Sequence, residues 1–241
     1  MRVETFGLPG AGKTTISTAV QGLLKDQGHI ALNARELDEL DAAHPPGFKR
    51  IWQEDKDRQT FHIARYLQKH GAFHSFCTKL YSDNTRNLGL LLSVGADLSR
   101  YRLRAGQLNS FWVDEGFLHL GVHALLEASG WNRVRAQDDI ARYLDLLPRP
   151  DAIMMVNASV ETATKGIFAR IPGRSAERST RRFENAFGGT EGMIERARII
   201  TMVAERMHSE GVPILEAERA GDLGETARAI ALKVNELANI C

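Results

Sequence analysis

The chain has 241 residues, with 31 Lys and Arg against 30 Asp and Glu, and 43% of its residues are hydrophobic. Ordinary apolar content with a net charge of +1 excludes a disordered chain and argues against a general nucleic-acid binder. A chain of this length buries a sizeable core without disulfides or metals, and domains usually have about 100–200 residues. We therefore predict a single domain over residues 1–241.

The cysteines and the apolar runs bear on the location of the protein. Cys77 and Cys241 lie far apart and match no metal-ligand spacing, so we expect reduced thiols in a reducing compartment. No apolar run approaches the roughly 18 residues that span a bilayer, and the first residues carry no apolar signal-peptide core. We expect a cytoplasmic protein that makes no membrane contact.

Apolar runs and helical patterns alternate along the chain. We expect strands at residues 2–6, 29–32, 111–113, 152–156 and 212–215, and helices at residues 14–24 and 227–237. This alternation predicts an α/β fold in three layers, with a central parallel sheet and helices on both faces. Pro213 donates no ladder hydrogen bond, so it is expected at a strand start or on an edge strand. Residues 38–88 show no clear strand and are expected to form a helical insertion.

The segment after the first expected strand reads Gly7-Leu8-Pro9-Gly10-Ala11-Gly12-Lys13-Thr14, which fits the phosphate-loop pattern G-x-x-x-x-G-K-[ST] in full. The glycines let backbone N–H groups turn toward an anion, and the following helix adds its positive end. Lys13 then reaches the β- and γ-phosphates, and the Thr14 hydroxyl ligates Mg²⁺. This predicts a P-loop NTPase fold with ATP and Mg²⁺ as cofactors. The expected nucleotide-binding residues are Gly7, Pro9, Gly10, Ala11, Gly12, Lys13, Thr14 and Thr15.

A second candidate element is the apolar run 111–113, which ends in Asp114-Glu115. A carboxylate at the carboxyl end of a parallel strand lies across from the phosphate loop. Asp114 is expected to organise Mg²⁺ together with Thr14, and either Asp114 or Glu115 to accept the proton of an attacking hydroxyl. The alternative is a solvated strand end that caps the next helix.

The third candidate element is basic: residues 165–182 contain six basic residues and one acidic residue. Guanidinium groups stabilise the charge on a migrating phosphoryl group, and a lid over residues 165–185 would exclude water. The arginines expected to act in catalysis are Arg170, Arg174 and Arg178. The alternatives are a solvated basic helix face or a site for nucleic-acid phosphates.

Taken together, these motifs resemble those of the P-loop nucleoside and nucleotide kinases, and of thymidylate kinase most nearly. The matching pieces are the phosphate loop, Val113-Asp114, the run 150–156 with Val160-Glu161-Thr162-Ala163 after it, and the Arg182-Phe183-Glu184 that closes the lid. The family has Asp-Arg where this chain has Asp114-Glu115. Residues 7–40 also look like adenylylsulfate kinase.

The resemblance implies roles that spacing alone does not give. It implies substrate-binding roles for Arg100, as the arginine that holds the acceptor's phosphate, and for Glu36, in Ala34-Arg35-Glu36. It also implies that the loop after residues 212–216 touches the adenine, and that residues 38–110 form the acceptor side.

The sequence therefore predicts an enzyme, a kinase that moves the γ-phosphoryl group of ATP to a hydroxyl or phosphate of a small-molecule acceptor, such as a nucleoside or nucleotide. One alternative is a kinase for a sugar, an antibiotic or an adenylylsulfate-like acceptor. Another is a non-catalytic, nucleotide-gated regulatory protein. Binding to nucleic acid is not expected, and a homodimer is one alternative for the oligomeric state.

Overall fold

The computed structural model describes residues 1–43, 55–80, 85–128, 133–170, 176–219 and 221–238. In this part of the chain, a five-stranded parallel sheet has the order β2-β3-β1-β4-β5. The strands are β1 (Arg2–Gly7), β2 (Ala31–Asn33), β3 (Ser110–Val113), β4 (Ala152–Asn157) and β5 (Ile214–Glu218). Each strand overlaps or adjoins an expected one, and the predicted α/β fold with a central parallel sheet is confirmed.

The sequence character of each strand matches its place in the sheet. The central strand β1 is buried along its whole length, because it pairs with β3 on one side and β4 on the other. The edge strand β5 begins one residue after Pro213, whose carbonyl accepts a hydrogen bond of 2.9 Å from the amide of Ile153. The prediction that this proline stands at a strand start on an edge is confirmed, since its missing N–H interrupts no ladder.

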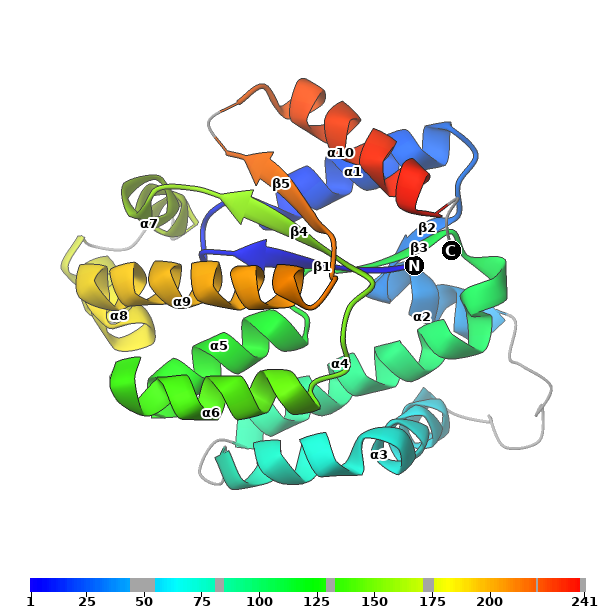
Figure 1. Cartoon of the computed structure of the whole chain (residues 1–241), viewed down its shortest axis with the longest axis horizontal. Coiled ribbons are helices and arrows are strands. Elements are labelled where there is room, and N and C mark those ends of the chain that lie inside the picture. The colour runs from blue at the N-terminus through cyan, green and yellow to red at the C-terminus, as the bar shows by residue number, and fades with distance from the viewer. Residues whose placement is uncertain (44–54, 81–84, 129–132, 171–175, 220, 239–241) are drawn as a thin grey trace.

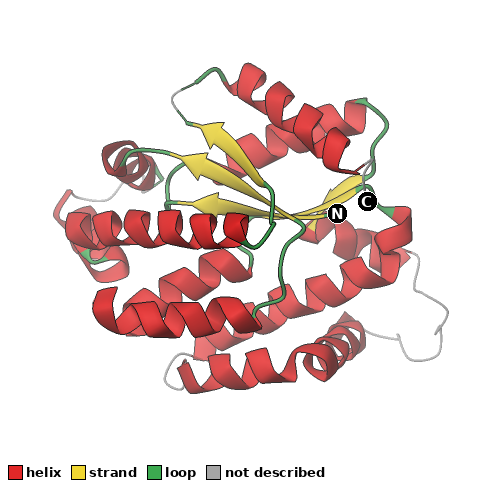
Figure 2. Cartoon of the chain, viewed as in Figure 1, coloured by secondary structure: helices red, strands yellow, loops and turns green. Residues whose placement is uncertain are grey.

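Helices cover both faces of the sheet and the carboxyl ends of its strands (Figures 1 and 2). One face carries α1 (Lys13–Asp26) and α10 (Leu223–Ala238), which pack on each other. The other face carries α5 (Phe117–Ala128) and α9 (Gly189–Ser209), with α6 (Arg133–Leu146) outside α5. At the carboxyl ends of the strands lie α7 (Val160–Ala169) and α8 (Ala176–Phe187).

The region between β2 and β3 is helical, as predicted. It contains α2 (Ala34–Ala43), α3 (Asp55–Leu80), α4 (Thr85–Arg104) and a short 3-10 turn η1 (Ala105–Gln107). Tyr66 and Phe73 of α3 are buried, and their rings pack against Phe117 at centroid distances of 5.9 and 5.5 Å. These aromatic side chains therefore anchor the insertion on α5 as core residues.

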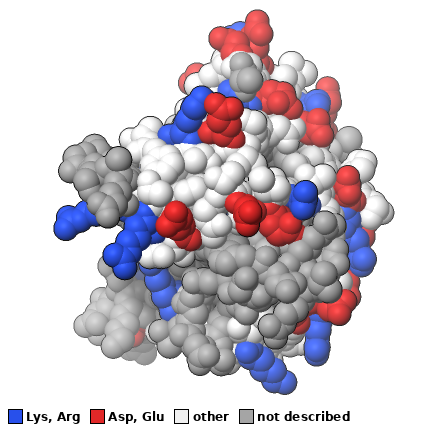
Figure 3. Space-filling view, turned by 90° about the vertical axis from the view of Figure 1, so that its left-hand side faces the viewer, with Lys and Arg blue, Asp and Glu red and all other residues white. Residues whose placement is uncertain are grey.

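Three further features bear on the predicted environment. None of the described helices is long and apolar enough to cross a membrane. Cys77 is a free, buried thiol whose pKa is raised to about 12 by burial, and Cys241 lies outside the described residues. Where residues are described, the face at the carboxyl ends of the strands mixes basic and acidic side chains and shows no continuous basic patch (Figure 3).

Candidate active site

The phosphate loop has the backbone conformation that its glycines were expected to allow. Gly7, Gly10 and Gly12 have φ values of 144°, 82° and 90°. Gly12 precedes the first residue of α1, and the amide of Ala11 donates to the carbonyl of Leu8 over 3.2 Å. Because side chains at such φ values are strained, the loop depends on glycine at these positions.

Neighbouring elements also leave no room for side chains on this loop. A Cβ on Gly7 would lie 2.6 Å from the carbonyl oxygen of Val156, and a Cβ on Gly10 would lie 2.1 Å from that of Ala163. On the other side, a Cβ on Gly12 would lie 3.0 Å from Nε of Arg219, the first residue after β5. The loop is therefore held between β4, α7 and the segment that follows β5.

Lys13 lies inside the loop. Its Nζ donates to the carbonyls of Gly7 and Leu8, over 3.2 and 3.1 Å, and the residue is only 8% exposed. Burial lowers the pKa of Lys13 to about 8, although the carboxylates of Glu115 and Asp114 act in the opposite direction. A desolvated lysine at the start of a helix is suited to bind an anion.

Asp114 is fixed against the first turns of α1. Its Oδ1 accepts a hydrogen bond of 2.7 Å from Ser17 Oγ, and Thr5 Oγ1 lies 3.2 Å from the same oxygen. Ser17 stands one helical turn after Thr14, so this bond places the carboxylate beside the end of the phosphate loop. Sequence reasoning missed Thr5 and Ser17, although the spacing of Ser17 from Thr14 already placed the two on one helix face.

The alternative role for the acidic strand end, capping α5, belongs to another residue. The amide of Leu118 in the first turn of α5 donates to Glu4 Oε2 over 3.0 Å, and Glu4 is fully buried on β1. Burial raises the pKa of Glu4, against the lowering effects of Arg2 and of the helix amides. Gly116 allows this approach, since a Cβ there would lie 2.4 Å from Glu4 Oε2. Glu4 thus caps α5, whereas Asp114 and Glu115 line a cavity.

These elements enclose a cavity of about 550 Å³. Among the predicted site residues, it is lined by Pro9, Gly10, Gly12, Lys13, Thr14, Asp114, Glu115 and Arg170. Arg178 is exposed on α8 and does not line it, and Arg174 lies outside the described residues. Instead, α8 contributes Phe183 and Phe187, whose rings pack on each other and, through Phe183, on Phe168 of α7.

Five polar side chains that line the cavity come from helices outside the predicted motifs. They are Arg86 and Asn87 at the start of α4, His119 and His123 on α5, and Arg196 on α9. The two histidines lie four residues apart and so share one face of α5. Arg196 and Arg86 carried no sequence signal beyond their charge.

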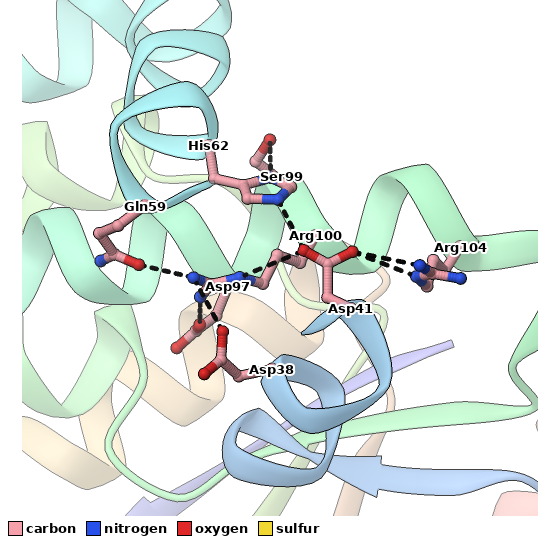
Figure 4. A network of polar contacts seen from close by, with 8 residues as sticks. All are labelled: Asp38, Asp41, Gln59, His62, Asp97, Ser99, Arg100 and Arg104. Carbon is pink, nitrogen blue, oxygen red and sulfur yellow. Dashed lines mark hydrogen bonds and ion pairs between the residues drawn. The ribbon is translucent and has the colours of Figure 1, made fainter. Parts of the chain in front are cut away.

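Two predicted substrate residues lie elsewhere. Arg100 is buried in an ion cluster between α2, α3 and α4, where its guanidinium meets Asp97 at 2.6 Å and Asp38 at 3.1 Å, and donates to Gln59 over 2.6 Å (Figure 4). At about 1.5 Å per residue, it lies about 15 Å along α4 from Leu90, which lines the cavity. The structure does not bring Arg100 to the acceptor side of this cavity.

Glu36 has a structural role at the start of α2. Its amide donates to Asn33 Oδ1 and its Oε2 accepts from the Asn33 amide, both over 3.0 Å, which is a reciprocal capping box. Its other oxygen pairs with Lys25 of α1 at 2.5 Å. Because both carboxylate oxygens are engaged there, Glu36 does not reach the cavity.

A second cavity of about 320 Å³ lies beside the first. It is lined by Gly7 and Leu8 of the loop, by Ser159 and Thr162 at the start of α7, by α9, and by Glu218 and Arg219 at the end of β5. Since α7 contributes to both cavities, the position of this helix on Gly10 sets the shape of each.

Comparisons with known proteins agree with this architecture. No family model matches the chain, and no curated protein matches its sequence. The structure of deoxyadenosine kinase from M. mycoides with bound dATP has 16% identity and a TM-score of 0.53, covering 98% of this chain and 100% of that chain. The structure of the same enzyme with bound dCTP is 16% identical to this chain, with a TM-score of 0.52, and the match again covers 98% of this chain and 100% of that chain. The chain thus has the fold of a P-loop nucleoside kinase.

Proposed function

We propose that this protein is an ATP- and Mg²⁺-dependent kinase that phosphorylates a nucleoside or nucleotide. The observation that carries the proposal is the single cavity that the phosphate loop, with Lys13 and Thr14, lines together with Asp114 and Glu115. Its volume of about 550 Å³ falls in the usual range for small-molecule sites.

In the proposed reaction, an acceptor oxygen attacks the γ-phosphorus, and the bond from that phosphorus to the β–γ bridging oxygen breaks. The proton of an acceptor hydroxyl passes to Asp114 or Glu115, and ADP leaves. The loop amides and Lys13 hold the phosphates, while Arg170 neutralises charge on the group in transfer. Arg174 and Arg178 remain proposed lid arginines.

The residues present fit a magnesium ion of the kind that a nucleotide brings with it. In the described residues, no three acidic, His or Cys side chains are grouped so that they could hold a metal ion. Mg²⁺ in nucleotide sites is usually held by one or two side chains together with phosphates and waters. Thr14 supplies a hydroxyl and Asp114 a carboxylate that Ser17 already orients. When bound, the ion would neutralise charge on the phosphates.

The walls of the cavity favour a planar acceptor with an apolar body. Leu90 of α4, Leu120 of α5 and Phe187 of α8 line the same cavity as the phosphate loop and give it an apolar part. A protein of the same fold is a deoxyadenosine kinase, which supports a nucleoside over a sugar or an antibiotic. The contact between Gly12 and Arg219 supports an adenine site at the loop after β5. Cytoplasmic location and a homodimer belong to the same proposal.

The test is phosphoryl transfer from MgATP with the purified chain, measured as ADP release across a panel of acceptors. The panel contains nucleosides, nucleoside monophosphates, sugars, aminoglycosides and adenylylsulfate, and Lys13→Ala serves as the inactive control. We expect acceptor-stimulated turnover with a nucleoside or nucleotide. If only a sugar, an aminoglycoside or adenylylsulfate stimulates turnover, that compound class replaces nucleosides and nucleotides as the proposed acceptor. Tight ATP binding with no stimulated turnover would instead identify a regulatory protein.

A further inference from the structure

Arg196 differs from the other arginines that line the active-site cavity. Arg86 and Arg170 are exposed, whereas Arg196 is only 2% exposed. It stands in the second turn of α9, a helix that contacts both β1 and α5 and so belongs to the rigid body of the domain. A guanidinium in this position is desolvated before any ligand binds.

The guanidinium of Arg196 contacts His123 and Phe187 in the described part of the chain. Its Nη2 lies 2.8 Å from Nδ1 of His123, and its Cζ lies 5.6 Å from the ring centroid of Phe187. Because arginine only donates, Nδ1 of His123 must be the acceptor, which requires a neutral ring. Burial and the charge of Arg196 lower the pKa of His123 to about 4, so the ring is neutral at pH 7. His123 thus fixes the guanidinium without cancelling its charge.

Arg196 and Lys13 line the same cavity, and their positive charges act on each other. Burial is the main cause that lowers the pKa of Lys13, and the carboxylates of Glu115 and Asp114 raise it. The positive charges of Arg170 and Arg196, which line the same cavity, lower it further. Two cations that interact unfavourably across a cavity are both stabilised by one anion placed between them. In the proposed reaction, the anion next to Lys13 is the terminal phosphate of ATP.

We infer that Arg196 is a further catalytic residue, which binds the phosphoryl group in transfer, and that His123 is the residue that positions it. This inference rests on the proposed function, because the phosphoryl group is that of the kinase reaction. It differs from the role proposed for the lid arginines, because Arg196 stands on α9, outside residues 165–185, and this helix packs on β1 and α5. A fixed, desolvated donor aimed at developing charge costs no reorganisation during the reaction.

The first experiment measures kinetics of Arg196→Ala, with Arg198→Ala as the matched control. Arg198 lies on the same helix, is exposed, and pairs with Glu195 at 3.3 Å. We expect kcat to fall about 10²–10³-fold in Arg196→Ala, with the KM for ATP changed less than about threefold, and added guanidine to restore part of the rate. A change in the KM for the acceptor alone would overturn the inference and make Arg196 an acceptor-binding residue.

The role of His123 is tested by two variants that differ in whether the new side chain can accept a hydrogen bond. In His123→Asn, the amide oxygen can accept from Arg196 as Nδ1 does, whereas His123→Phe leaves no acceptor. We expect kcat of the Phe variant to fall about tenfold, and that of the Asn variant to stay within about threefold of the wild type. Equal effects of the two substitutions would contradict a positioning role.

A binding experiment separates this inference from the proposed function. Aluminium fluoride with MgADP mimics the phosphoryl group in transfer, so its presence should tighten MgADP binding to the wild type. We expect Arg196→Ala to lose about tenfold or more of that gain, and Arg196→Lys, the more conservative change, to lose part of it. Loss of the gain in a protein that phosphorylates no acceptor would refute only the proposed function. If the wild type shows normal kinase activity, two results would refute only the role of Arg196. One is that Arg196→Ala keeps the full gain in MgADP affinity, and the other is that aluminium fluoride gives no such gain in the wild type.

Discussion

Gly10 of the phosphate loop and Gly166 of α7 meet backbone to backbone. A Cβ added to Gly166 would lie 2.2 Å from the carbonyl oxygen of Gly10. The helix α7 therefore rests directly on the loop, and Arg170 follows at its carboxyl end, where the side chain lines the cavity. The distance from the loop to this arginine is set by the absence of one side chain.

The first prediction concerns this contact. Gly166→Ala pushes α7 away from Gly10 and moves Arg170 with it, so we expect kcat to fall about 10–100-fold, since displacements near 1 Å have effects of this size. The matched control is Gly22→Ala in α1, where a Cβ meets nothing within 4 Å. The control should raise the melting temperature, because alanine favours a helix over glycine by up to about 1 kcal/mol. A normal kcat in Gly166→Ala would show that the helix position is not coupled to catalysis.

The second prediction sets activity against stability at Lys13. Lys13→Ala removes the charge that binds the phosphates, so phosphoryl transfer should be lost with the fold intact. Lowering the pKa of this residue from 10.5 to about 8 corresponds to a cost of about 3 kcal/mol for keeping it charged in the empty site. We therefore expect Lys13→Met to melt at the same temperature as the wild type or higher without nucleotide, and to gain nothing from MgATP. A large drop in melting temperature would contradict the burial argument.

The third prediction is a proton linkage at the same residue. Between about pH 8 and pH 10.5, the unfolded chain holds a proton on Lys13 that the empty folded protein has released, so this residue makes stability rise with pH in that window. A bound triphosphate favours the charged form, so binding at pH 8.5 should take up protons. Calorimetry in two buffers with different ionisation enthalpies measures this uptake. Binding of MgATP at pH 8.5 without proton uptake would contradict this linkage.

Local motifs made the phosphate loop predictable, whereas long-range packing placed the rest of the site. The loop can be recognised from a run of adjacent residues, and Asp114 follows from the rule that parallel strands end at one sheet edge. Arg196 lies 183 residues from Lys13 in the sequence and reaches the cavity through the packing of α9 on β1 and α5, which no local pattern encodes. Glu36 was assigned by resemblance, although its spacing from Asn33 also fits a capping box.

The fourth prediction compares two lid arginines. Arg170 lines the cavity, whereas Arg178 is exposed on α8 away from it. We expect Arg170→Met to reduce kcat about tenfold or more while ATP affinity changes less than about threefold, because transition-state contacts affect kcat. Arg178→Met should have the smaller effect. Equal losses of kcat would show that α8 moves over the phosphates during turnover, and a loss of ATP affinity alone would contradict the lid role of Arg170.

The fifth prediction concerns the buried ion cluster between α2, α3 and α4. Asp41 is fully buried, and its carboxylate bonds His62 at 3.0 Å and Arg104 at 3.3 Å (Figure 4). Asp41→Asn leaves buried cations without their counter-charge, so we expect a loss of about 3–5 kcal/mol in urea unfolding at pH 7. Asp38→Asn is the control: its side chain is 48% exposed and pairs with Arg100, so about 0–1 kcal/mol is expected.

The pH dependence of this loss identifies its electrostatic origin. Burial raises the pKa of Asp41, but the hydrogen bonds and charges of His62 and Arg104 outweigh it, and the net pKa lies below the ordinary value of 3.8. The stabilisation by Asp41 is therefore complete above about pH 4 and is lost as the pH falls through the lowered pKa. The difference between wild type and Asp41→Asn should be constant from pH 7 to pH 5 and shrink below pH 4. A constant difference throughout would assign the loss to packing rather than charge.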